Sequence, residues 1–181
     1  KTKNTELENV DKKAYRVDPS AYKLLQKARE TIHEDPRKAL GYVDSAIAIN
    51  SSFIRAYMLA SYITAFKLKA PRRGIQYVKK ADTLFQQSGK SNTFPYAKVY
   101  MRYAQIYRLQ KNWDSSIRYL KLLKKHYEKF NLTGTFGYIF ADSVMGHLYR
   151  MKKDKAGFKR HFHYAFKNIQ SLGKEEQYKY A

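Results

Sequence analysis

The chain has 181 residues, 44% of them hydrophobic and only 4 of them proline, so it is long enough to bury a continuous core and is not globally disordered. The absence of cysteine excludes disulfides and thiolate chemistry, and no apolar run approaches the ~18 residues that a membrane span needs. Its 36 basic and 15 acidic side chains give a formal net charge of +21.

The positive charge is concentrated after residue 44. Residues 1–44 hold 10 basic and 8 acidic side chains, a net charge of +2, whereas residues 45–174 hold 25 basic and 5 acidic ones, a net charge of +20. A surface of this kind attracts acidic peptides, nucleic acid or anionic lipid at long range, and salt should weaken all three attractions.

Two Asp-Pro pairs mark the first two predicted helices. Asp18 and Asp35 can each cap free amide groups, and the proline that follows suits the first helical turn. Residues 1–17, which come before, are expected to form a polar tail or a loose helix. The side chains predicted to pack inward are Tyr22, Leu25, Ala28 and Ile32 in the first helix and Ala39, Val43, Ala46 and Ile49 in the second.

Two more helices are predicted between residues 50 and 87. Residues 50–52, Asn-Ser-Ser, are expected to cap the third helix, and Ala70-Pro71 to open the fourth. Residues 88–92, Ser-Gly-Lys-Ser-Asn, predict a loop. The predicted packed positions are Tyr57, Ala60 and Thr64 in the third helix and Gly74, Val78 and Ala81 in the fourth.

The clearest helical hairpin lies between residues 99 and 123. Residues 112–114, Asn-Trp-Asp, interrupt two amphipathic stripes and predict a tight turn, and residues 131–134 break the chain before a fourth hairpin. The stripes consist of Tyr100, Tyr103, Ala104 and Tyr107, then Ser116, Ile117, Leu120 and Leu123. The fourth hairpin is expected to pack Gly146, Tyr149, Phe158, Phe162 and Ala165.

The hairpins repeat at a fixed interval. Gly74, Ser116 and Phe158 occupy equivalent places 42 residues apart, and Ala39 precedes Gly74 by 35. Residues 103–117, YAQIYRLQKNWDSSI, resemble the signature of the tetratricopeptide repeat family, and the resemblance extends over roughly residues 21–170. It implies an all-α fold over residues 18–172, a right-handed superhelix of about four antiparallel helical hairpins. Residues 173–181 are expected to begin a further helix.

The resemblance also implies a binding groove. In this family the first helix of each hairpin lines the concave side, where arginine forks and lysines suit carboxylates or phosphates. Lys98 and Arg102 match the basic pair of the family's carboxylate clamp, but Leu25, Arg29 and Leu59 replace its remaining lysine and asparagines. The candidate groove residues are Arg29, Arg55, Lys98, Arg102, Gln105, Arg108, His147 and Arg150. The alternative is that these side chains are merely solvated.

The abundant aromatic residues have two interpretations. Seventeen tyrosines among many cations could stack on nucleobases, but most of them lie at the repeated core positions. Met58, Tyr62 and Phe66 would form an apolar pocket beside the groove or pack against the next hairpin.

Signals for catalysis or metal binding are weak. His161 and His163 are two residues apart, which places them on different sides of a helix. No metalloprotease, paired-cysteine or phosphate-loop spacing occurs. Lysine pairs such as Lys124-Lys125 are expected on outer faces or in turns. We therefore expect no active site, no metal and no cofactor.

The sequence favours a non-catalytic scaffold that binds a protein or acidic peptide in a basic concave groove. The 42-residue period exceeds the usual ~34 and resembles the sensor domains of bacterial regulators, which implies the partner-docking domain of a larger regulator. The alternative is a nucleic-acid-binding helical solenoid. Because the chain begins at Lys1 without methionine, we expect a processed protein or a fragment. Its compartment, cytoplasmic or exported, and its oligomeric state are left open.

Overall fold

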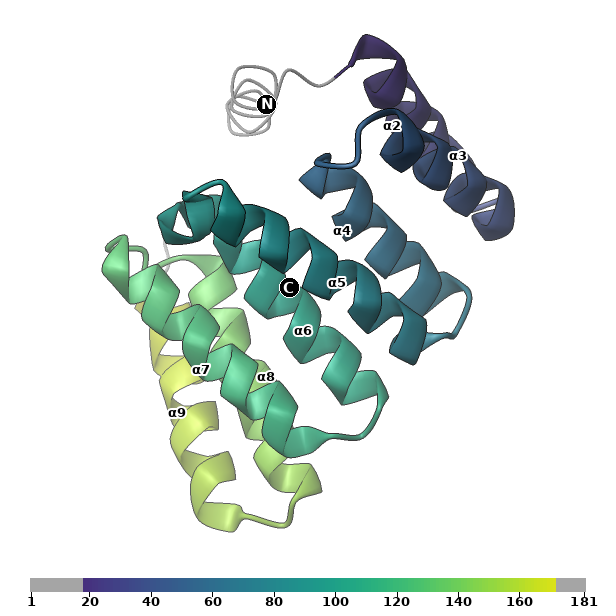
Figure 1. The fold of residues 1–181 in the computed structure, drawn as a ribbon. Coiled ribbons are helices and arrows are strands. Elements are labelled where there is room, and N and C mark those ends of the chain that lie inside the picture. The colour runs from purple at the N-terminus through teal and green to yellow at the C-terminus, as the bar shows by residue number, and fades with distance from the viewer. Residues whose placement is uncertain (1–17, 172–181) are drawn as a thin grey trace. The chain divides into compact units, whose positions relative to one another are not determined.

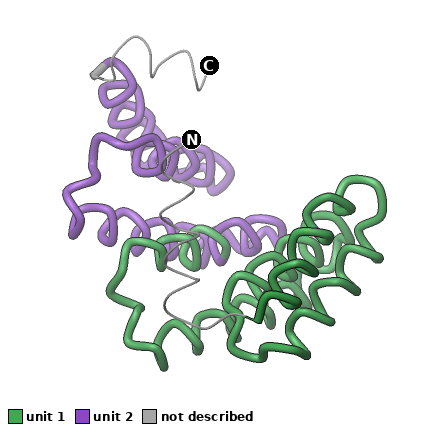
Figure 2. Tube along the Cα trace, turned by 90° about the horizontal axis from the view of Figure 1, so that it is seen from above, with its two compact units in different colours: residues 1–102 green, residues 103–181 purple. Residues whose placement is uncertain are grey.

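The computed structural model describes residues 18–171, and these residues form helices and turns without any strand. The all-α class is therefore confirmed for this part of the chain, while the right-handed superhelix stays a prediction. Contacts between residues divide the chain into two compact units, residues 1–102 and 103–181, which are coloured separately in Figure 2. The predicted tail at residues 1–17 and the segment 173–181 lie outside the described residues.

The first unit is a series of short helices, each packed on the next. Helix α2 packs on α3, and α3 packs on α4 (Figure 1). The π-helix η1 continues α4, and α5 packs on both of them. Their bounds are α2 Pro19–Thr31, α3 Pro36–Ile49, α4 Ile54–Tyr62, η1 Ile63–Lys67 and α5 Pro71–Gln87. Two 3-10 turns follow, η2 Lys90–Asn92 and η3 Phe94–Tyr96, within the predicted loop and after it.

The boundary between the two units falls within α6, Ala97–Leu109. In the second unit α7 packs on α8 and α8 packs on α9. The start of α7 is attached to α6 by the Ser116 hydroxyl, which donates a hydrogen bond of 2.8 Å to the Ala104 carbonyl. The bounds are α7 Trp113–Lys129, α8 Phe136–Met151 and α9 Lys155–Ser171.

Most of the predicted helix starts are confirmed. The Asp18 carboxylate accepts from the Ser20 amide, and the Asp35 carboxylate accepts from two amides of the first turn of α3. The cap predicted at residues 50–52 is wrong, because α4 begins later and its N-cap residue, Phe53, makes no side-chain cap. Asn50 instead accepts hydrogen bonds from the amide and hydroxyl of Ser52, which closes a tight turn before α4.

The predicted core positions are largely buried, with two exceptions, one at the end of α3 and one in the middle of α9. Leu25, Val43 and Val78 are almost inaccessible to solvent. Ile49, the last residue of α3, is 48% exposed, and Phe162 on α9 is 58% exposed. Both lie on a face that no described element covers. Helical spacing identifies a residue's face but not whether a neighbour reaches it, which is why these two predictions are wrong.

A distinctive turn repeats every 42 residues. Lys69, Lys111 and Lys153 all have positive φ angles, between 56° and 60°, where glycine is the usual residue. Each comes two residues before a second helix, which begins at Pro71, Trp113 or Lys155. The left-handed residue ends one helix and redirects the chain into the next. The repeat found in the sequence therefore has a matching repeat in the backbone.

A small residue at or next to the fourth position of each of these second helices makes a close contact with the preceding helix. A Cβ atom added to Gly74 would lie 2.7 Å from the Ala65 Cβ in η1, which is too close for two carbon atoms. Ser116 has the same place in α7 and is fully buried. In α9 this place holds Phe158, and the close contact moves to Gly157, where a Cβ would lie 2.6 Å from the Tyr149 ring. A small residue is thus required at the start of each second helix.

The close contact at Gly74 makes a prediction about stability. We expect Gly74→Ala to lower the free energy of unfolding by about 2 kcal/mol, because the backbone of η1 must move aside. Gly41 is a matched control, since it lies in α3 with nothing within 4 Å of an added Cβ. Gly41→Ala should raise the free energy by up to about 1 kcal/mol through helix propensity. Urea unfolding followed by circular dichroism measures both, and equal effects would contradict the packing.

Candidate binding site

The predicted groove residues are divided between the two units. Arg29, Arg55, Lys98 and Arg102 belong to the first unit, and Gln105, Arg108, His147 and Arg150 belong to the second. Arg29, Lys98, Arg108, His147 and Arg150 are exposed, whereas Arg55, Arg102 and Gln105 are half-buried. The four candidate residues of the first unit and the four of the second therefore have different neighbours.

Arg102 lies over a pair of aromatic rings in the first unit. Its guanidinium is 5.1 Å from the centre of the Tyr62 ring and 5.5 Å from that of Phe66. The two rings stack on each other at 5.4 Å. They stand where α4 passes into η1, so the wider turn of the π-helix carries part of the site. Of the two alternatives for these rings, the observed contact is packing against α6.

The charge on Arg102 has no acidic partner among the described residues. Its buried Nε also has no hydrogen-bond partner there. Burial lowers the pKa of the guanidinium to about 10, which shows that the surroundings disfavour its charge. A desolvated cation whose neighbours are rings rather than carboxylates is suited to receive an anion.

Arg55 repeats the arrangement on a smaller scale. Its guanidinium lies 5.7 Å from the centre of the Tyr22 ring, which brings α4 and α2 together. Lys27 of α2 similarly lies 6.0 Å from the ring of Tyr42 on α3. Contacts between cations and aromatic faces therefore recur along the first unit, so some of its positive charge contributes to packing as well as to the surface.

In the second unit, His147 and Arg150 border an apolar groove between α8 and α9. The Arg150 guanidinium lies 3.3 Å from His147 Nδ1. The groove has a volume of about 270 Å³. Phe162, Phe166 and Ile169 are 58%, 54% and 42% exposed within it. Its other lining residues are Ser143, Phe158 and Ala165. Gln105 and Arg108 lie on α6 and do not line this groove.

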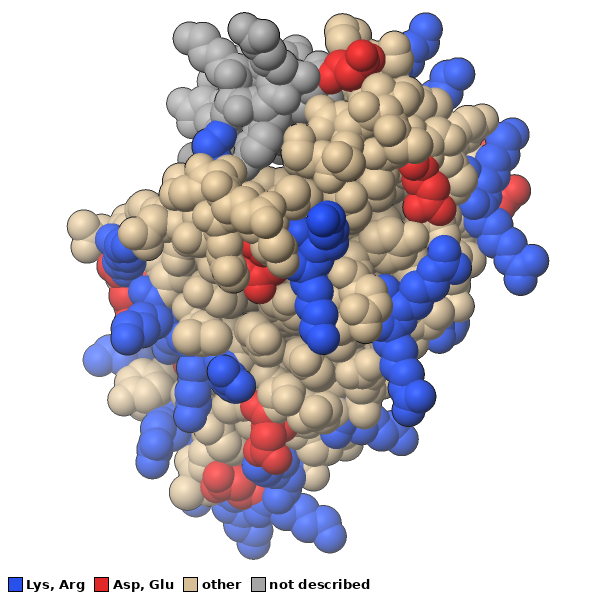
Figure 3. Space-filling view, viewed as in Figure 1, with Lys and Arg blue, Asp and Glu red and all other residues tan. Residues whose placement is uncertain are grey.

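Within the described part of the second unit, residues 103–171, every acidic residue is engaged locally. Residues 103–171 contain 14 basic and 4 acidic side chains, a net charge of +10. Asp114 pairs with Lys152, and the Glu128 carboxylate accepts from the Tyr138 hydroxyl at 2.8 Å. Asp154 accepts from an amide at the start of α9. On the face of the protein shown in Figure 3, the blue basic side chains accordingly predominate over the red acidic ones.

The fourth acid, Asp142, forms a buried polar cluster that sequence reasoning missed. Its side chain is fully buried, and it accepts from Lys124 Nζ at 2.5 Å and contacts His161 Nδ1 at 2.8 Å. These three residues attach α7, α8 and α9 to one another. The expectation that Lys124 belongs to an outer face is therefore wrong. A signal was present, since Asp142 is the only acidic residue in α8 and lies between the apolar residues Ala141 and Val144, beside Ser143.

The described residues include no group of three or more side chains that could hold a metal ion. None of the helices in residues 18–171 combines the length and apolarity that crossing a bilayer demands.

Arg102 makes a testable prediction. The desolvation of its charge costs about 3 kcal/mol, judged from the size of the pKa shift, and cation–π contacts return ~1–2 kcal/mol. Methionine keeps contact with both rings without the charge. We expect Arg102→Met to raise the free energy of unfolding by about 1 kcal/mol, and Arg108→Met, exposed on the same helix, to change it by less than about 0.5 kcal/mol. Urea titration tests this, and a loss of stability at Arg102 would contradict it.

The cluster around Asp142 leads to a second prediction about stability. Asp142→Ala leaves the buried ends of Lys124 and His161 without their carboxylate partner, so we expect it to cost about 3 kcal/mol of unfolding free energy. Asp154→Ala removes only a capping hydrogen bond and should cost about 1 kcal/mol. Denaturant unfolding of the two variants gives the comparison. If Asp142→Ala proved no more harmful than Asp154→Ala, the cluster would not be what holds the three helices together.

Comparison of the chain with protein-family models, with curated proteins and with solved structures gave no match in any of the three.

Proposed function

We propose that this chain is a non-catalytic scaffold of tetratricopeptide-like helical hairpins that binds acidic segments of partner proteins. The observation that carries the proposal is the groove between α8 and α9, where His147 and Arg150 stand beside exposed aromatic side chains. A partner-docking domain of a larger regulator is the setting that the resemblance to this family implies.

The composition of the groove favours a particular kind of partner. Exposed Phe162, Phe166 and Ile169 offer an apolar strip along one face of α9, and contiguous apolar surface of this kind commonly marks an interaction site. The cationic side chains at its edge favour carboxylates. An amphipathic helix satisfies both requirements, with apolar anchors spaced three and four residues apart and acidic residues on its flanks.

The surrounding charge supports the same partner. With a net charge of +10 over residues 103–171 and each acid already engaged, this unit attracts an acidic segment and repels a basic one. Arg102 in the first unit, which no described carboxylate neutralises, offers an additional point of attachment for an anion.

A labelled peptide tests the groove. The probe is an amphipathic helix with leucines spaced three and four residues apart and glutamates elsewhere, and fluorescence anisotropy measures its affinity. We expect the double variant His147→Glu, Arg150→Glu to weaken binding about tenfold or more, because it places like charges beside the glutamates. Phe162→Ser should weaken binding of the same peptide by removing an apolar anchor.

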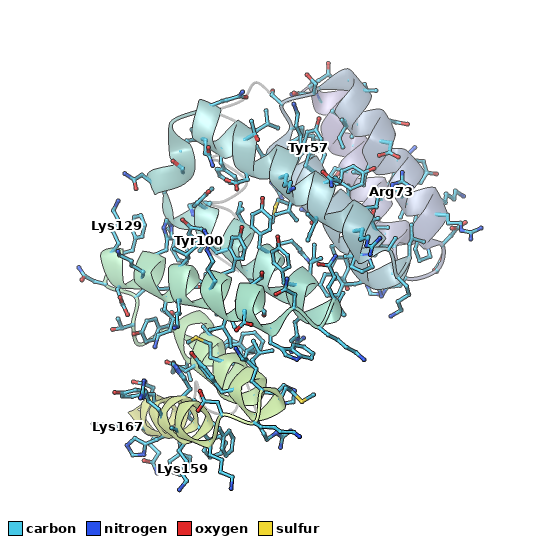
Figure 4. The ribbon with its side chains drawn as sticks, turned by 60° about the horizontal axis from the view of Figure 1, so that its bottom comes forward. Tyr57, Arg73, Tyr100, Lys129, Lys159 and Lys167 are labelled. Carbon is cyan, nitrogen blue, oxygen red and sulfur yellow. The ribbon has the colours of Figure 1, made fainter. Side chains whose placement is uncertain are left out.

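The matched control changes charge outside the groove. Lys159 and Lys167 lie on α9 and line neither edge of the groove (Figure 4). Their double replacement by glutamate removes more positive charge than the groove variant does, yet it should change the affinity less than about threefold. Equal losses for the two double variants would mean that net charge alone attracts the peptide, and the groove would not be the site. Circular dichroism checks that each variant remains helical.

A further inference from the structure

A second pocket in the same unit is separate from the peptide groove. It has a volume of about 460 Å³ and lies along α7, closed on one side by Tyr149 of α8 and by Lys152 in the turn that follows. This volume is within the ~300–1,000 Å³ of small-molecule sites. The lining residues are Asp114, Ile117, Arg118, Lys121, Leu122, Lys125, Tyr149 and Lys152, and none of them lines the groove between α8 and α9.

Tyr149 provides a flat wall for this pocket. Its ring stacks on the ring of His161 at 5.2 Å, with only 4° between the two planes. Gly157 permits this arrangement, because a Cβ atom there would lie 2.6 Å from Tyr149 Cγ. The ring therefore lies against α9, and the part of it that lines the pocket is the part that His161 leaves uncovered.

The buried cluster described above holds this wall in place. His161 Nδ1 contacts the Asp142 carboxylate at 2.8 Å, and Asp142 also accepts from Lys124 at 2.5 Å. The orientation of the His161 ring is thus constrained through Nδ1 by a carboxylate that has no access to solvent. An aromatic ring stacked on such a support loses little freedom when a ligand stacks on it.

Three cations border the pocket on the α7 side. Arg118, Lys121 and Lys125 are three and four residues apart, which places them on one face of the helix. All three are exposed, and none makes an ion pair with a described residue. Lys152 contributes less positive charge to the pocket, because Asp114 pairs with it there. The net charge at the opening is that of the three α7 side chains.

We propose that this pocket binds a nucleoside phosphate, with the base against Tyr149 and the phosphate on Arg118, Lys121 and Lys125. A purely inorganic anion would use the cations but leave the aromatic wall and the apolar side chains of Ile117 and Leu122 without a partner. A base and a phosphate together use both kinds of surface, in the combination of aromatic stacking and basic groove that single-stranded nucleic acids favour. This inference does not depend on the peptide groove.

A base joined to a phosphate is present both in a free nucleotide and in each nucleotide of a single-stranded nucleic acid. Three probes separate them: ATP, a labelled oligoadenylate, and inorganic polyphosphate as an anion without bases. Comparable affinity for ATP and for oligoadenylate assigns the pocket to free nucleotides, and much tighter binding of the oligomer assigns it to single strands. Either result supports the proposal, provided that polyphosphate binds about tenfold more weakly than a nucleotide probe of similar charge.

Matched variants locate the contact. Arg118→Gln with Lys121→Gln should weaken oligoadenylate binding about tenfold or more and reduce the slope of log affinity against log salt by about 1.4, the value for two lost phosphate contacts on a single strand. Lys159→Gln with Lys167→Gln changes the net charge equally on α9 and should change the affinity less than about threefold. Tyr149→Leu should weaken binding of the oligomer, and Tyr149→Phe, which keeps the ring, should restore it.

Three results would overturn the proposal. They are an equal effect of the two glutamine pairs, polyphosphate binding as tight as that of oligoadenylate, or full affinity in Tyr149→Leu. The glutamine pairs lie at exposed positions, so they remain informative even if Tyr149→Leu unfolds. The variant His147→Glu, Arg150→Glu should keep its nucleotide affinity within about threefold, which separates failure of this pocket from failure of the peptide groove.

Discussion

The close contact between the two helices of a pair, found in α4–η1 with α5, α6 with α7 and α8 with α9, is the constraint on which the rest of the structure depends. It is made at the same point each time, four residues into the second helix or next to it: Gly74 against Ala65, Ser116 against the Ala104 carbonyl, and Gly157 against the Tyr149 ring. Only small side chains allow the backbones to approach so far. The large aromatic residues are consequently displaced to the sides of these contacts, where they meet arginine and lysine side chains or stack on one another, as Tyr103 does on Tyr119 at 4.5 Å.

In the second unit a buried carboxylate adds a polar constraint to this packing. Asp142 brings side chains from α7 and α9 onto α8, so the three helices keep one arrangement in a core that is otherwise apolar. Both proposed binding surfaces use α8: the peptide groove forms where it meets α9, and the pocket forms where it meets α7. A single internal acid therefore supports two surfaces that differ in chemistry, one lined by phenylalanines and the other by a tyrosine and three cations.

Much of the fold could be predicted from the sequence, because it depends on local signals. Asp18 and Asp35 cap helices as their position before proline indicates, and the 42-residue spacing is found again in the turns. The candidate site could be predicted from local sequence signals only in part. Arg102 was identified as a groove residue from its spacing, but its placement over Tyr62 and Phe66 depends on a π-helix for which periodicity offers no signal. The pairing of Lys124 with Asp142 depends on contacts between helices, and sequence spacing within one helix cannot show them.

The left-handed lysines have a consequence for how each hairpin is stabilised. Lys69, Lys111 and Lys153 each follow the last turn of a first helix, where backbone carbonyls carry the negative end of the helix dipole. Glycine would adopt this backbone conformation with less strain, by about 1 kcal/mol, but it has no charge to offer those carbonyls. Lysine at this position therefore has a more strained backbone than glycine would have, but it places a positive charge at the end of the helix. Because the same arrangement occurs at every 42-residue step, the turns themselves account for part of the excess of lysine in this protein.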